Sequence, residues 1–135
     1  MKLTIPGEPV AKGRVRMTSS GIAYTPAKTM NYEILVKELY IINHQDRPLI
    51  EGQIEATLKA YFTIPKSATK KKRALMIDEK VRPIKRPDLD NIAKTVLDAL
   101  NGLAYKDDSQ VVSLILEKYY SDTPRVELEL IEQEV

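Results

Sequence analysis

The sequence contains no cysteine and a single histidine, His44. Without cysteine, the chain has no disulfides, thiolate zinc sites, iron–sulfur clusters or cysteine nucleophile. One imidazole also excludes a multi-histidine metal site within one chain. Any bound metal must therefore be held mainly by oxygen, which favours Mg²⁺ or Mn²⁺. Tryptophan is absent and aromatic residues make up 6% of the chain, which gives little support to a base-stacking platform for single strands.

Long hydrophobic runs are absent too. No apolar stretch approaches the ~18 residues that a membrane span needs, and the N-terminal residues lack the apolar segment of a signal peptide. We therefore expect a cytoplasmic protein with no membrane partner. The length of 135 residues fits one domain, and the 43% hydrophobic and 30% charged content is ordinary for a globular fold.

The net charge of +2 conceals a strong segregation of charge along the chain. Residues 66–86 carry nine basic and two acidic side chains, whereas residues 87–135 carry four basic and eleven acidic ones. A basic block of this kind concentrates polyanions such as nucleic acid. A solvated lysine-rich helix and loop would have the same composition, and charge alone does not separate the two interpretations.

Hydrophobic periodicity predicts an α+β fold for residues 1–135, with about three helices on a mixed or antiparallel sheet. A hairpin turn is predicted at 19–21, a helix N-cap at Thr25, a loop over 79–87 and a second hairpin turn at 122–124. The strand at 111–120 is expected to be buried. The predicted strands are 2–6, 53–63, 111–120 and 125–131, and the predicted helices are 26–44, 69–78 and 89–101.

A group of acids and one lysine follows the basic block. Asp88 and Asp90 lie where the predicted loop enters a helix, and Lys94 shares a helix face with Asp90 four residues earlier. Asp107 and Asp108 precede the next strand. Because a strand start and a helix start can meet in space, three or four carboxylates are expected to converge. Clustered carboxylates repel one another unless a cation lies between them, and Mg²⁺ would supply that cation.

Simpler explanations exist for each of these residues taken singly. Asp88 can cap a helix, Asp90 and Lys94 can form an ordinary i,i+4 ion pair, and Asp107 with Asp108 can form a solvated turn. The D-x-D pattern by itself occurs in many unrelated proteins. The functional interpretation rests on the succession of acids and phosphate-binding cations in consecutive segments.

The whole pattern resembles the RusA family of Holliday junction resolvases. The resemblance is carried by residues 86–94, 97–101 and 107–111, together with an opening in which Ile5, Pro6, Gly7 and Pro9 precede the cations of residues 12–16. It covers essentially the whole chain. It implies a homodimeric, Mg²⁺-dependent endodeoxyribonuclease (Mn²⁺ being possible) that binds four-way DNA junctions and cuts two opposed strands symmetrically. It also implies a role in DNA recombination and repair, in bacteria or their prophages.

The resemblance also implies the site residues. The essential acids of the family, as metal ligands, correspond to Asp88, Asp90 and Asp108, and its essential lysine corresponds to Lys94. The choice between Asp107 and Asp108 stays open, because the spacing in this region varies. Lys94 would stabilise charge in the transition state.

The basic side chains are expected to contact backbone phosphates, which positions DNA without reading its sequence. These residues are Lys12, Arg14, Arg16, Lys70, Lys71, Lys72, Arg73, Arg82, Lys85 and Arg86. Two other functions are compatible with the sequence: a less selective nuclease acting on flaps or forks, and a junction-binding protein that does not cut. The acid set disfavours the second, since a pure phosphate binder gains nothing from anions beside its basic surface.

Overall fold

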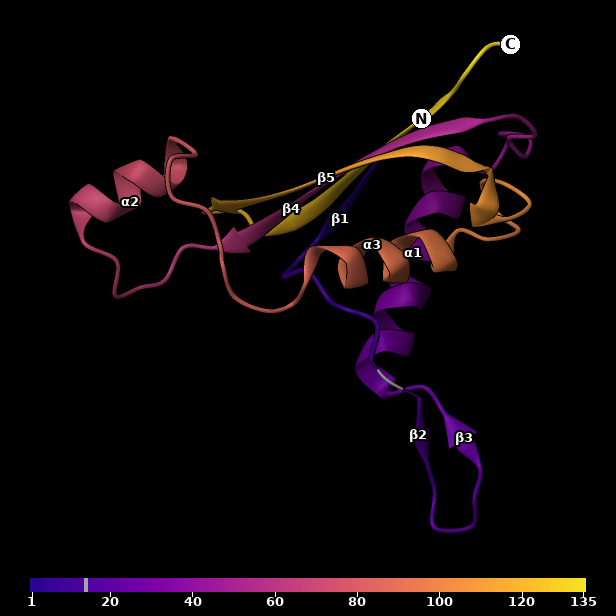
Figure 1. Cartoon of the computed structure of the whole chain (residues 1–135), viewed down its shortest axis with the longest axis horizontal. Helices are drawn as coiled ribbons and strands as arrows, with labels where there is room; N and C mark the ends of the chain where they lie inside the picture. Colours follow the sequence, from indigo (N-terminus) through magenta and orange to yellow (C-terminus); the bar gives the residue numbers. More distant parts are fainter. Residues whose placement is uncertain (14) are drawn as a thin grey trace.

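Four segments of alternating hydrophobicity form a mixed sheet in the computed structural model, which describes residues 1–13 and 15–135 (Figure 1). The strands β1 (Lys2–Pro6), β4 (Ile54–Thr63), β5 (Val111–Ser121) and β6 (Arg125–Glu132) lie in the spatial order β1-β6-β4-β5. β5 is parallel to β4, and β6 is antiparallel to both β4 and β1. The predicted α+β class and mixed sheet are confirmed.

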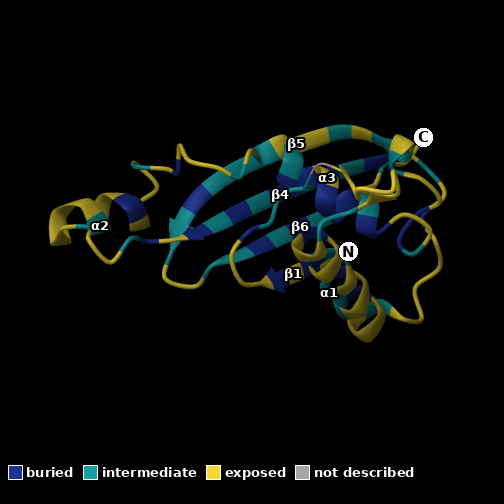
Figure 2. Ribbon diagram, turned by 90° about the horizontal axis from the view of Figure 1, so that it is seen from below, coloured by how far each residue is buried: buried dark blue, intermediate teal, exposed yellow. Residues whose placement is uncertain are grey.

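The core lies between the sheet and two helices, α1 (Ala27–His44) and α3 (Leu89–Ala99), which cover one face of the sheet (Figure 2). Alternate residues of β4 are buried, as the predicted strand face requires, and Leu58 is fully inaccessible. On α3, Ile92 and Val96 are likewise 0% exposed. The predicted apolar face of this helix is therefore confirmed, and its polar face is left free for the charged residues.

Two pieces project from this body (Figure 1). One is a hairpin arm, formed by β2 (Arg16–Met17) and β3 (Ala23–Tyr24), which contains the predicted turn at 19–21. The other is α2 (Lys70–Ile77), whose N-terminus is capped by Thr69, because its Oγ1 accepts a hydrogen bond from Lys72 N at 3.2 Å. A short 3₁₀ helix, η1 (Asp108–Gln110), precedes β5. Among the helices of the described residues, none is long and apolar enough to span a bilayer.

The predicted hairpin at 122–124 is wrong. β5 and β6 follow each other in sequence but are not paired, because β6 lies between β1 and β4 while β5 lies on the far side of β4. Alternating hydrophobicity reports which face of a strand is buried and carries no information about its neighbours in the sheet. β5 is consequently an edge strand, and the expectation that it is buried is also wrong: Val112 is 56% exposed.

The start of α1 also differs from the prediction by one residue. Pro26 occupies the N-cap position with an extended backbone, and no side chain caps the helix there. Thr25 is therefore not the N-cap. Such one-residue shifts are common at helix ends and do not alter which face of the helix is buried.

Candidate active site

Two carboxylates lie at the N-terminal end of α3, and the N-cap carboxylate does not cap the helix. Asp88 is the N-cap residue but makes no side-chain capping hydrogen bond, and Asp90 lies in the first turn. Both are exposed, as is Lys94 one turn later. Within the described chain, none of the three has a salt-bridge partner within 4.0 Å. The two simple explanations for these residues, a capping carboxylate and an Asp90–Lys94 ion pair, are therefore not seen.

Asp107 and Asp108 lie side by side in sequence but have different environments. Asp107 caps η1: its carboxylate accepts from Ser109 N at 3.2 Å, and Gln110 Oε1 accepts in return from Asp107 N at 3.1 Å. Hydrogen bonds to Ser109 lower the pKa of Asp107. The Asp108 side chain does not cap the turn, and its backbone N–H donates to Asn101 Oδ1 at 2.9 Å. The Asp107 carboxylate is thus used in capping η1, whereas the Asp108 carboxylate is not.

Asp108 lies against a further acid, Asp98 on α3. Partial burial, followed by a hydrogen bond with the Asp98 carboxyl and the charges of Asp107 and Asp98, raises the pKa of Asp108. Asp98 is in turn fixed by Lys12, whose Nζ lies 3.0 Å from Asp98 Oδ2 and 2.9 Å from Glu33 Oε1. Burial alone would lower the pKa of Lys12, but these two hydrogen bonds outweigh it and raise the pKa. The chain therefore holds Lys12 as a charged, paired ammonium.

The expected convergence of Asp88, Asp90 and Asp108 is not seen. No three acidic or histidine side chains among residues 1–13 and 15–135 lie close enough together to hold one metal ion. The reason is the short connection after α3, which places Asp108 beside Asn101 at the C-terminal end of the helix. Asp88 and Asp98 are separated by about 15 Å along the axis, at ~1.5 Å per residue. The acids therefore form two groups, one at each end of α3.

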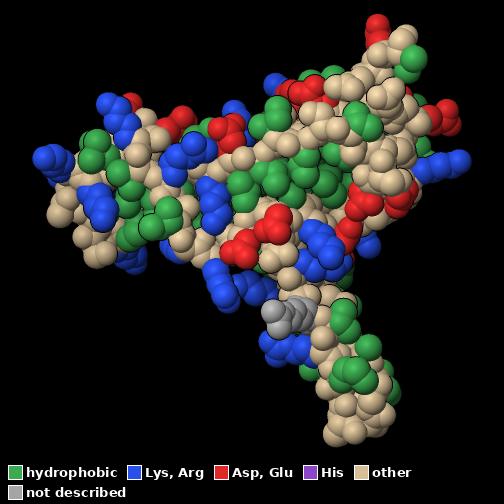
Figure 3. All heavy atoms as spheres, viewed as in Figure 1, with side chains coloured by type: hydrophobic (Ala, Val, Ile, Leu, Met, Phe, Trp, Pro, Cys, Tyr) green, Lys and Arg blue, Asp and Glu red, His purple; other side chains and the backbone are tan. Residues whose placement is uncertain are grey.

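The surface view shows this arrangement directly. In Figure 3, acidic side chains gather at both ends of the α3 position, with basic side chains between them and more along the side toward α2. Such alternation suits a polyanion that must come close to carboxylates, since the cations offset the repulsion between the acids and the phosphates.

The predicted phosphate-contacting cations fall into two groups. Three form ion pairs within the chain: Lys12 with Glu33 and Asp98, Arg73 with Asp122, and Arg82 with Glu117. Arg82 also stacks on the Tyr119 ring, 4.4 Å from its centroid. Six others have no salt bridge to any described residue, and these are Arg16, Lys70, Lys71, Lys72, Lys85 and Arg86. Arg14 lies outside the described residues.

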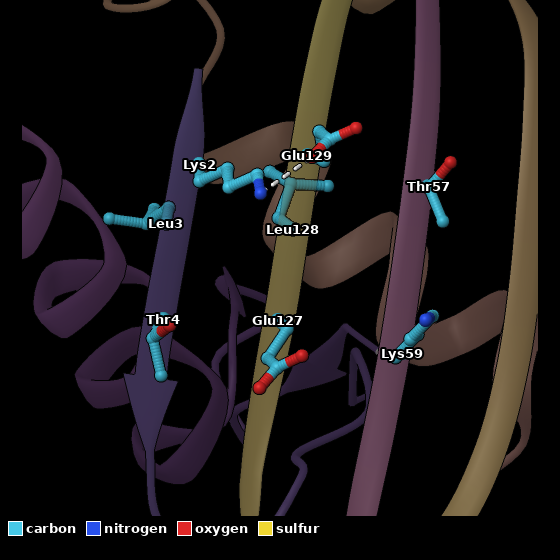
Figure 4. A pocket seen from close by; sticks show the side chains of 8 residues that line it. All are labelled: Lys2, Leu3, Thr4, Thr57, Lys59, Glu127, Leu128 and Glu129. Atoms are coloured by element: carbon cyan, nitrogen blue, oxygen red, sulfur yellow. Dashed lines mark ion pairs between the residues drawn. The ribbon is translucent and has the colours of Figure 1, made fainter.

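A hollow on the opposite face of the sheet is unrelated to these acids. Figure 4 shows its lining side chains on β1, β6 and β4. Lys2 forms a salt bridge with Glu129 at 3.5 Å, and Lys59 of β4 is paired in register with Glu127 of β6. Its charges are mixed in sign, and α1 and α3 cover the other face. The candidate active site is therefore on the α3 side.

Comparison with known proteins identifies the family. The family described as "Endodeoxyribonuclease RusA" matches residues 6–131. The chain belongs to this family. It is also 42% identical over 133 residues to the uncharacterized protein YqaN of Bacillus subtilis (strain 168), an alignment that covers 95% of this chain and 93% of YqaN. The family resemblance predicted from the motifs is confirmed. The roles of Asp88, Asp90, Asp108 and Lys94 in this RusA-family member stay predictions.

Sequence reasoning overlooked Asp98 and the true setting of Lys12. A signal was available, since Asp98 follows Lys94 and Asp90 at intervals of four residues and so continues the same ridge of the helix. The contact of Lys12 with Glu33 and Asp98 joins segments 21 and 86 residues apart in the chain. No local pattern predicts such a contact.

Substitutions of Asp107 and Asp108 should have different effects on stability and on cleavage. We expect Asp107→Ala to lower the melting temperature, because it removes a turn-capping acceptor, while leaving cleavage close to wild type. Asp108→Asn should keep or raise the melting temperature, because it removes an anion facing Asp98, and should impair cleavage. Thermal melts and cleavage assays on both variants test this. The reverse pattern would move the predicted ligand to Asp107.

Proposed function

We propose that this RusA-family member is a Mg²⁺-dependent endonuclease that cuts two opposed strands of four-way DNA junctions during recombination and repair. The observation that carries the proposal is the pair of exposed carboxylates, Asp88 and Asp90, at the N-terminal end of α3. Neither has a cation partner among the described residues, although the basic segment 66–86 ends beside them. Two unneutralised carboxylates beside a polyanion-binding surface need a metal cation to approach DNA.

The residues present fit Mg²⁺ in kind. The available ligands are carboxylate oxygens, and Mg²⁺ is usually bound by one or two carboxylates together with water and substrate phosphate oxygens. Asp88 and Asp90 would hold it, and Mn²⁺ suits the same ligands. Asp108 lies beside Asn101 at the other end of α3, so its predicted role as a third ligand of this ion does not fit within one chain. When bound, such an ion lowers the pKa of a water and stabilises the attacking and leaving oxygens of a phosphodiester.

The side chains around the acids have separate tasks in this proposal. Lys94 lies on α3 between the two acid groups and would offset the charge that develops on the phosphate. The unpaired cations of α2 and its following loop would bind phosphates further along the DNA. Lys12 would act on the site indirectly, because its ammonium is already bound to Asp98 and Glu33.

A homodimer is part of the proposal. The chain supplies one set of Asp88, Asp90 and Lys94, and two coordinated cuts need two such sets. A two-fold symmetric pair of chains would present them symmetrically to a four-way junction, whose opposed strands are related in the same way. Sedimentation of the free protein tests this part independently of activity.

A comparison of substrates distinguishes this function from the alternatives. Purified protein is incubated in Mg²⁺ with a four-way junction, a flap, a fork and a linear duplex of related sequence. The proposal expects the junction to be cut fastest and in two opposed strands. Equal cutting of flaps and forks would favour the less selective nuclease, and tight junction binding without any cutting would favour a binding protein.

The lysines of α2 give a prediction about affinity. Replacing Lys70, Lys71 and Lys72 with Gln should weaken binding to all junction sequences about equally. It should also flatten the dependence of log affinity on log salt by close to ~0.9 per lost phosphate contact. Arg73 is left in place because it pairs with Asp122. A Lys2→Gln, Lys59→Gln double variant on the opposite sheet face is the control, and an unchanged slope in the α2 variant would mean that α2 does not touch DNA.

A further inference from the structure

A hollow of about 460 Å³ lies where the first turns of α1 and α3 meet the segment 9–13. Its volume is within the ~300–1,000 Å³ of ordinary ligand clefts. Polar residues line it from four separate segments: Lys12 from the segment 9–13, Lys28 from α1, Arg86 and Asp88 from the loop before α3, and Asn91 from α3. Its apolar wall is formed by Pro9, Val10 and Pro87.

The wall of this hollow is fixed by contacts on both sides of the segment 9–13. Lys12 N donates to Asn91 O at 3.4 Å, and Gly13 N donates to Thr29 Oγ1 at 2.9 Å. Thr29 is 2% exposed. A Cβ on Gly13 would lie 2.8 Å from Pro26 Cγ, so the close approach of this segment to α1 requires glycine. The hollow is thus built by packing that is present without a ligand.

The charges in the hollow favour an anion. Lys28 and Arg86 are both exposed, and neither forms a salt bridge within 4.0 Å in the part of the chain that the structure describes. Lys12 also lines the hollow, but Glu33 and Asp98 already neutralise its ammonium. Two cations without a salt bridge and the single carboxylate of Asp88 therefore line the hollow. An arginine and a lysine that line the hollow from two different elements suit a phosphate group, which accepts hydrogen bonds on several sides.

We propose that this hollow binds one backbone phosphate of the DNA strand that is cut, close to the scissile phosphate, with Lys28 and Arg86 as its two cationic contacts. The apolar wall of Pro9, Val10 and Pro87 packs against the adjoining sugar. This inference rests on the proposed nuclease function, because it takes Asp88 as part of the cleavage site. It assigns a substrate-positioning role to Lys28, which lies on a different element from the basic segment 66–86.

The test compares Lys28→Gln with Lys37→Gln, an exposed lysine of the same helix that lies outside the hollow. Single-turnover cleavage of a four-way junction should fall by ~10–100-fold in Lys28→Gln, the size of one lost charge-assisted contact, and should be unchanged in Lys37→Gln. Melting curves of both variants establish that they are folded.

A scan of neutral methylphosphonate linkages near the cut identifies the phosphate. In the wild type, one linkage other than the scissile one should slow cleavage, and in Lys28→Gln the same linkage should have little further effect. Equal rates for Lys28→Gln and Lys37→Gln, or fully additive losses at every linkage, would overturn the inference. If the wild type does not cut at all, the proposed function fails. In that case, measuring the binding affinity for the same series of methylphosphonate junctions still decides whether Lys28 contacts one phosphate.

Discussion

Asp90→Asn should abolish detectable junction cleavage while junction binding stays the same or becomes tighter. The substitution removes an oxygen ligand for the metal, and it also removes a negative charge that repels DNA phosphates. Asp88→Asn should behave in the same way, since both carboxylates lie at the start of α3 and Asp88 makes no capping hydrogen bond there. Cleavage under single-turnover conditions and binding by fluorescence anisotropy separate the two effects.

Asp46→Asn is a suitable control for this experiment. Asp46 is exposed in the turn after α1 and has no salt bridge among the described residues, so its loss changes net charge by the same amount away from α3. It should cut normally. Asp88→Asn and Asp90→Asn proteins that cut at the wild-type rate in Mg²⁺ would remove the carboxylates from the mechanism.

Lys94→Ala should reduce turnover by ~10²–10³, the scale seen when one preorganised charge-stabilising donor is removed. If Lys94 were merely a helix-surface partner of Asp90, the loss would be a few tenths of a kcal/mol of stability with normal activity. The structure contains no Asp90–Lys94 salt bridge within 4.0 Å, so a purely pairing role has no contact to support it.

Folding should survive this substitution, because Lys94 is exposed and lies opposite the buried Ile92 and Val96. Lys94→Arg keeps the charge but replaces a compact ammonium with a wide planar group, and we expect it to be impaired too. A thermal melt beside the single-turnover assay separates stability from catalysis. Normal turnover in Lys94→Ala would exclude this lysine from the active site and leave the argument for the carboxylates intact.

Periodicity in the sequence predicted the elements well because each one has a single buried face. The alternation along residues 53–63 and the apolar stripe of α3 both arise from burial against the same core, and each was placed within a few residues. Strand order was not predictable in this way. The insertion of β6 between β1 and β4 depends on pairing between segments far apart in the chain, which leaves no local pattern.

The arrangement of the candidate site residues was predictable from the sequence only where they lie on one helix. Sequence spacing placed Asp88 and Asp90 at the start of a helix, with Lys94 on the same helix face as Asp90, and the structure has Asp88 as the N-cap and Asp90 in the first turn of α3. It failed for Asp108, because the direction of the chain after α3 decides which end of the helix that residue meets. It also failed for Lys12, whose partners Glu33 and Asp98 lie on two different helices. Contacts of this kind follow from packing.

The most direct measurement is cleavage of a synthetic four-way junction, labelled on each strand in turn, by the wild-type protein in Mg²⁺ or in EDTA. The proposed function predicts two symmetric cuts in opposed strands, giving nicked duplexes that can be ligated, in Mg²⁺ alone. An intact junction in Mg²⁺ despite measurable binding would contradict it, as would equal cutting in EDTA.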